Sequence, residues 1–167
     1  MARKKLRKRH DDIMGGMDER PGFLIRRAHQ ISQAVFIEEC TRLDMTATQF
    51  GVLSVLMRAG ELNQITIARL LGYDRSTTGL VVKLLEDRGM IVRTADPADR
   101  RGHVLRLTPS GKAMQRRAAP LVDRVRDRLA GAFTTAEAAA FIKLLIKFTR
   151  SFDDIERVPP LHRAEGR

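Results

Sequence analysis

The chain has 167 residues, of which 43% are hydrophobic and 31% are charged, and its formal net charge is +11 at pH 7. This composition excludes a disordered chain, and the length is enough for one domain with a sizeable core. The excess of positive charge favours an acidic polymer as partner, above all nucleic acid. A membrane surface is disfavoured, because no amphipathic apolar face accompanies the basic residues at the start of the chain.

The single cysteine, Cys40, excludes a disulfide within the chain and fits a reducing environment. No apolar segment approaches the length of a membrane span, and none follows the basic start as it would in a secretory signal. We therefore expect a cytoplasmic protein without membrane contact.

Residues 1–20 are predicted to form a flexible basic arm. Six of the first nine residues are basic and none is acidic, and Gly15 and Gly16 follow. Such a run is usually a solvated tail, and the alternative is a non-specific grip on DNA phosphates. A second tail, which includes Pro159 and Pro160, is predicted over residues 156–167.

A long helix is predicted over about residues 22–43, with Pro21 at its start. The seam of a packed helix is formed by residues at spacings of four and three, namely Leu24, Ala28, Ile31 and Val35. A second stripe beside it mixes polar and apolar groups, namely Ile25, His29, Ser32 and Phe36. This second stripe is either an exposed flank or dimer contact, or one wall of a ligand pocket.

The next helix supports the elements that follow it. Thr46 and Gln49 have the spacing of a capping box. Phe50, Leu53 and Leu56 are predicted to form its inner face, and Gly60 to end it.

Residues 63–89 predict two short helices joined by a tight turn. Asn63 caps the first, Gly72 ends it, and Asp74 caps the second. One side of the second helix is predicted to pack inward, and it carries Thr77, Leu80, Val81, Leu84 and Leu85. The other side carries Arg75, Ser76, Gly79, Val82, Lys83 and Glu86.

Small and polar groups at the start of a helix suit insertion into a DNA major groove. The expected DNA contacts lie on or flank the polar side, and they are Arg75, Ser76, Thr77, Thr78, Gly79 and Lys83. The alternative is an ordinary pair of helices with a solvated face.

Two β-prone runs follow, at residues 91–94 and 104–107. The loop between them contains Arg100 and Arg101, so the pattern predicts a hairpin with a basic tip after a candidate recognition helix. Such a hairpin can reach the minor groove or the phosphates. The predicted unit is a winged helix-turn-helix over about residues 46–108.

The last part of the chain, residues 109–155, predicts two further helices. Thr108 and Pro109 begin the first, which runs to about Ala130 and should be kinked or interrupted at Pro120. Thr134 and Glu137 form a capping box for the second. Its apolar face requires a partner, and it is made by Phe141, Leu144, Leu145, Phe148, Phe152 and Ile155.

Three segments carry a resemblance to a known family. TATQFGVL, ITIARLLGYDRSTTGLVVKLLEDRGMIVR and DPADRRGHVLRLTPSGKAM resemble the multiple-antibiotic-resistance regulator (MarR) family of bacterial repressors. The resemblance covers about residues 22–155, and its most specific piece is the Asp-Arg-Arg wing followed by Leu-Thr-Pro-Ser-Gly. It implies a homodimer of winged helix-turn-helix subunits, released from DNA by a small and often aromatic ligand.

The fold expected from the residues and from the resemblance is mainly α, with a small β-wing and long N- and C-terminal dimerisation helices at about residues 22–43 and 109–155. Dimerisation is expected to depend on Leu24, Phe141, Leu145, Phe148 and Phe152. The resemblance further implies that Asp99 positions the wing by pairing with an arginine.

The segment RPGFLIRRAHQIS resembles the branch of the family that controls breakdown of aromatic acids. This resemblance implies an aromatic carboxylate or its coenzyme A thioester as ligand. The expected ligand-binding residues are Arg26, Arg27, His29, Ser32 and Phe36. Arginine suits capture of a carboxylate or phosphate, although Arg26 and Arg27 lie about 100° apart on a helix and cannot both enter one small pocket.

The sequence offers little support for catalysis, a cofactor or a metal. No histidine stands at ligand spacing from another histidine or from Cys40, and the four are His10, His29, His103 and His162. No phosphate-binding loop or nucleophile elbow is present. We expect no enzyme, no metal and no cofactor.

The function expected is a ligand-responsive transcriptional repressor that binds a pseudo-palindromic double-stranded operator as a homodimer. One alternative is an oxidant-sensing repressor that uses Cys40, but Glu38 and Glu39 should raise the pKa of that thiol and disfavour its thiolate. The other alternative is a basic protein that coats DNA without sequence specificity.

Overall fold

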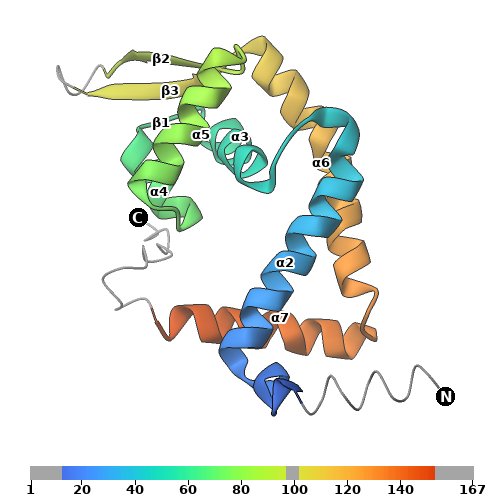
Figure 1. The fold of residues 1–167 in the computed structure, drawn as a ribbon. Helices are drawn as coiled ribbons and strands as arrows, with labels where there is room; N and C mark the ends of the chain where they lie inside the picture. Colours follow the sequence, from blue (N-terminus) through green and yellow to red (C-terminus); the bar gives the residue numbers. More distant parts are fainter. Residues whose placement is uncertain (1–12, 97–101, 153–167) are drawn as a thin grey trace.

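A computed structural model describes residues 13–96 and 102–152 (Figure 1). The chain is mainly helical, with one small antiparallel sheet, as the sequence predicted. The elements, in chain order, are η1 (Met17–Glu19), α2 (Pro21–Cys40), η2 (Thr41–Leu43), α3 (Ala47–Ala59), β1 (Glu61–Leu62), α4 (Gln64–Leu71), α5 (Arg75–Asp87), β2 (Ile91–Ala95), β3 (His103–Leu107), α6 (Pro109–Ala130) and α7 (Thr135–Arg150). The tail predicted over 156–167 and residues 1–12 of the predicted arm lie outside the described residues.

Figure 1 shows the molecule in two parts. Helices α3, α4 and α5 gather with the strands at one end. Helices α2 and α6 run side by side away from this group, and α7 crosses near their far end. Ion pairs join α2 to α6, because Arg128 binds Glu38 at 2.6 Å and Glu39 at 3.3 Å.

Each predicted helix cap is present, because each rests on a hydrogen bond between residues close in sequence. The backbone N–H of Thr66 donates to Asn63 Oδ1 at 2.8 Å, and that of Thr77 donates to Asp74 Oδ1 at 2.7 Å. Complete capping boxes begin α3 and α7, at Thr46 and Thr134. Gly72 ends α4 with φ 66°, in the left-handed region that glycine adopts without strain.

The sheet has the strand order β1-β3-β2. The hairpin of β2 and β3 was predicted, and its register pairs Ile91 with Leu107 and Ala95 with His103. The sequence analysis missed β1, because two residues are too short to show the alternation of a strand.

The main core lies between α3, α4, α5, the strands and the first half of α6. Its fully buried side chains include Val52, Leu53, Ile67, Val82 and Leu85. A smaller cluster joins α2 to α6 and contains Phe36, Cys40 and Val125. The two clusters share Phe50, whose ring lies 6.4 Å from that of Phe36, so α2 and α6 are packed directly onto the helix-turn-helix.

Helix α6 continues through Pro120 without interruption. The predicted interruption is therefore wrong. Proline removes the hydrogen bond to the carbonyl four residues earlier, at Arg116, and its ring crowds that carbonyl. Both residues are exposed, so the helix can adjust there without disturbing the core.

Helix α7 has no buried residue within the chain. Its large apolar side chains stay between 41% and 63% exposed.

Within the described residues, no single helix is long and apolar enough to cross a membrane. Only α6 and α7 taken together pass that test, by length and composition, and they are bent by 104° at their break.

The start of α6 fits tightly against the start of β2. Thr108 donates from its hydroxyl to the Gly89 carbonyl at 2.7 Å and from its backbone N–H to the Met90 carbonyl at 3.0 Å. Gly111 is buried one turn further on, and a Cβ there would overlap the Met90 carbonyl oxygen. This position therefore requires glycine for close approach rather than for its backbone angles.

Gly111→Ala is expected to lower the free energy of unfolding by roughly 1–3 kcal/mol, because backbone must move to admit the methyl group. Gly22→Ala is the matched control, since Gly22 lies in α2 and a Cβ there would have no atom within 4 Å. The control should be neutral or stabilising by up to about 1 kcal/mol. Urea unfolding at one fixed protein concentration measures both, and equal stability of the two variants would contradict this packing.

Candidate nucleic-acid interface

The orientation of α5 is set by the side chains that it buries. Thr78, Val82 and Leu85 are each 0% exposed and face the core. The predicted orientation, with Leu80 and Leu84 inward and Val82 outward, is wrong. Leu80 is 70% exposed and Leu84 is 45% exposed.

The outward side of α5 combines polar groups with one prominent leucine. Arg75, Ser76 and Lys83 are exposed, as predicted, and Leu80 lies near Ser76 and Lys83 on the outward side. This side is therefore the part of α5 that can enter a groove of DNA.

Thr78 is removed from the candidate interface by its burial. Its hydroxyl donates to the Asp74 carbonyl at 2.8 Å, which satisfies the polar group inside its own helix. The prediction of a side-chain contact between Thr78 and DNA is wrong for this reason.

Thr77 and Gly79 lie at the margin of the exposed side. The Thr77 hydroxyl donates to Asp74 Oδ2 at 2.6 Å. This hydrogen bond and the one from the Thr77 backbone N–H lower the pKa of Asp74, so the cap remains ionised to lower pH than a free aspartate. A Cβ on Gly79 would lie 3.3 Å from Gln64 Nε2, so this glycine allows α4 and α5 to approach each other.

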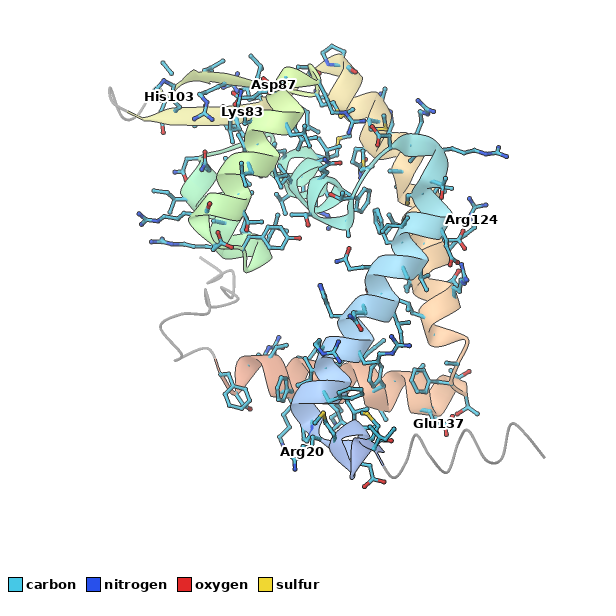
Figure 2. The ribbon with its side chains drawn as sticks, viewed as in Figure 1. Arg20, Lys83, Asp87, His103, Arg124 and Glu137 are labelled. Carbon is cyan, nitrogen blue, oxygen red and sulfur yellow. The ribbon has the colours of Figure 1, made fainter. Side chains whose placement is uncertain are left out.

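Several basic side chains near α5 are already paired. Lys83 binds Asp87 at 3.2 Å on the next turn, and Figure 2 shows both beside the sheet that carries His103. Arg93 binds Glu86 at 3.1 Å, and Arg106 on β3 binds Glu61 on β1. Among the described residues, Arg75 has no carboxylate partner, so its charge is available to a ligand.

The predicted wing residues Asp99, Arg100 and Arg101 lie outside the described residues. The strands that lead to them are paired up to Ala95 and His103, and the backbone N–H of Asp96 donates to the Gly102 carbonyl at 3.0 Å. The basic segment 97–101 is therefore joined to the two paired ends of the β2–β3 hairpin.

The five predicted ligand-binding residues lie on α2 and differ in their exposure. Arg26, Arg27 and His29 are exposed on α2, and the Arg26 guanidinium lies 5.0 Å from the centre of the Phe23 ring. Ser32 is half-buried, and Phe36 is packed in the smaller core cluster.

A cavity of about 370 Å³ lies between the end of α2, the start of α3 and the end of α5. Local sequence patterns do not reveal this cavity, because its walls come from segments far apart in the chain. Gln49 in its wall is only 5% exposed. The lining residues are Ile37, Cys40, Thr41, Asp44, Met45, Thr46, Gln49, Leu84 and Arg88.

Cys40 has little thiolate character in this environment. Burial is the main cause that raises the pKa of its thiol, and the charge of Glu39 adds to it, while Arg124 acts in the opposite direction. The predicted direction is confirmed, although the sequence analysis attributed it to carboxylates alone. Within residues 13–96 and 102–152, no group of three or more His, Cys, Asp or Glu side chains has a metal-binding arrangement.

The residues predicted to mediate dimerisation form an uncovered apolar surface. Leu24, Phe141, Leu145, Phe148 and Phe152 are each between 41% and 50% exposed. A second apolar cavity, of about 350 Å³, lies where α6 meets α7, and its wall includes Val125, Phe133 and Phe141.

Comparisons with known proteins agree with this arrangement. The MarR family matches over residues 43–102. The chain is 29% identical over 141 residues to the HTH-type transcriptional repressor NicR of Pseudomonas putida, which covers 84% of this chain and 89% of that protein.

Two solved structures are similar over most of their length. One is a structure of BpsR from Bordetella bronchiseptica, on the regulation of its DNA binding by 6-hydroxynicotinic acid. It has a TM-score of 0.76 and 31% identity, and the match covers 79% of this chain and 94% of that chain. The other is the transcriptional repressor CouR bound to a 23-mer DNA duplex, with a TM-score of 0.76 and 35% identity over 82% of this chain and 97% of that one.

Arg75→Ala is expected to weaken binding to a duplex selected by the protein from a random pool by roughly 1–3 kcal/mol, through loss of a base contact. Arg75→Lys is the matched control, because it keeps the charge but loses the guanidinium fork. The lysine variant should recover binding to random duplex more than binding to the selected one. Fluorescence anisotropy at one salt concentration measures both, and equal weakening of Arg75→Ala on the two duplexes would show a phosphate contact only.

Proposed function

Because the chain belongs to the MarR family of transcriptional regulators, we propose that it is a ligand-responsive repressor that binds a pseudo-palindromic operator as a homodimer. The observation that carries this proposal is the exposed side of α5, capped at Asp74 and carrying Arg75, which has no carboxylate partner among the described residues. We call α5 the recognition helix from here on. In the dimer, two such helices enter successive major grooves about one DNA turn apart.

The homodimer is supported by the uncovered apolar side chains of α2 and α7. A single chain leaves Leu24, Phe141 and Phe148 in water, whereas a second copy can cover all of them. The occupant proposed is therefore the same surface of a second subunit.

The wing supplies a second contact in this proposal. Arg101, and secondarily Arg100, reach the minor groove or its phosphates, and Asp99 holds the loop in position. The β2–β3 pairing up to Ala95 and His103 supports this role, because it holds together the two strand ends from which the loop continues.

The effector proposed is a small anionic aromatic acid or its coenzyme A thioester. Support comes from the BpsR structure, which concerns regulation by 6-hydroxynicotinic acid, an aromatic carboxylic acid. In this chain, Arg26, Arg27 and His29 provide positive or titratable groups beside the proposed dimer surface of α2, with Ser32 and Phe36 on the same helix. The effector releases DNA only if it binds the non-DNA geometry more tightly than the DNA-bound one.

The raised pKa of Cys40 and its burial disfavour the alternative of an oxidant sensor, because that chemistry requires a thiolate that the oxidant can reach.

A DNA-coating protein without specificity is distinguished by comparing the affinity for a selected operator with that for random duplex at the same salt.

Phe148→Asp is expected to disrupt the dimer, because assembly would bury an unpaired carboxylate. The dissociation constant should rise at least about 100-fold. Lys147→Asp is the matched control, since it places the same charge on another side of α7. Sedimentation equilibrium measures both, circular dichroism checks folding, and Leu145→Asp serves as a second variant. A folded Phe148→Asp dimer of native affinity would place the interface elsewhere.

Titration of the protein–operator complex with aromatic acids and with their thioesters tests the effector. The native protein should be released by at least one of these anions. Arg26→Ala, Arg27→Ala and His29→Ala are compared with it, and at least one should require about tenfold more effector, through loss of a charge-assisted hydrogen bond. Arg42→Ala, an exposed arginine beyond the end of α2, is the matched control. Release of all variants at one concentration would remove these residues from the effector site.

A further inference from the structure

Leu80 occupies an unusual position for a leucine. It is 70% exposed, more than any other large apolar side chain of the recognition helix. At about 100° per residue, it projects about 40° from Ser76 and about 60° from Lys83, almost opposite to the buried Thr78, Val82 and Leu85. An apolar side chain therefore lies next to Ser76 and Lys83, on the outward side of the helix that meets DNA in the proposed function.

The major groove presents one apolar group that such a side chain can recognise. Thymine carries a C5 methyl group there, and the other three bases carry none. Burial of a leucine side chain against this methyl group removes apolar surface of both partners from water. Neither a phosphate nor a base hydrogen-bonding group gives the leucine a comparable contact.

From this geometry we infer that Leu80 is a specificity-determining residue, which reads the C5 methyl group of a thymine in each half of the operator. The inference rests on the proposed function, and it adds the base that the exposed leucine selects. Arg75, Ser76 and Lys83 supply polar contacts around it, whereas Leu80 contributes discrimination without a hydrogen bond.

Leu84 has a different environment, although it lies one turn further along the same helix. It lines the cavity between α2, α3 and α5, together with Met45 and Gln49. Its exposed fraction is 45%, well below that of Leu80. Leu84 also lies outward, but it borders this cavity and is less exposed than Leu80, so it serves as an internal control.

The test uses the full chain and a duplex that it selects from a random pool. Each symmetry-related pair of thymines in the selected operator is replaced by deoxyuridine, which lacks the C5 methyl group but keeps the same base pairing. At one pair, the native protein should lose affinity by about fourfold for each methyl contact. Leu80→Ala should bind the thymine duplex more weakly by a similar factor, and it should not respond to deoxyuridine at that pair.

Leu84→Ala should keep the native response to deoxyuridine. Leu80→Ala should keep the native melting temperature, because the side chain that it removes is exposed. If an operator is selected but every thymine tolerates deoxyuridine, or if Leu80→Ala retains the native response, the inference is overturned while the proposed function stands. If no sequence is selected from the pool, the proposed function fails and the inference fails with it.

Discussion

The packing of Thr78, Val82 and Leu85 against the core is the constraint on which the candidate interface depends. These three side chains lie on one side of the recognition helix and are fully buried. They fix its rotation about its own axis, and thereby decide which residues meet DNA. A rotation by one residue would exchange Leu80 for Val81 at the centre of the exposed side and would change the chemistry presented to the groove.

The sequence predicted the parts of the fold that depend on neighbouring residues. The caps at Asn63, Asp74 and Thr134 follow from hydrogen bonds across three residues, and the hairpin follows from two β-prone runs around a turn. The rotation of α5 was predicted incorrectly, because burial there does not follow polarity. Thr78 satisfies its hydroxyl on the Asp74 carbonyl and can be buried, while Leu80 remains in water.

The proposed effector site shows why the remaining site residues were harder to predict. Arg26, Arg27 and His29 are exposed on α2, so the described residues of one chain do not enclose them. The cavity bounded by Gln49 and Arg88 is built from three helices, and no local pattern indicates which residues will converge. Local rules thus predict elements, whereas sites depend on tertiary contacts and, in the proposed dimer, on a second chain.

The electrostatics of the helix-turn-helix are less positive than the net charge of +11 suggests. Lys83 is paired with Asp87, Arg93 with Glu86, and Arg106 with Glu61. Exposed pairs of this kind contribute little stability, typically about 0–1 kcal/mol, so phosphates can replace their carboxylates at small cost. In the free protein, however, the pairs reduce attraction to DNA of any sequence. Each paired cation must exchange its carboxylate before it binds a phosphate, so specific recognition in the proposed function depends on the groove-facing side chains of α5.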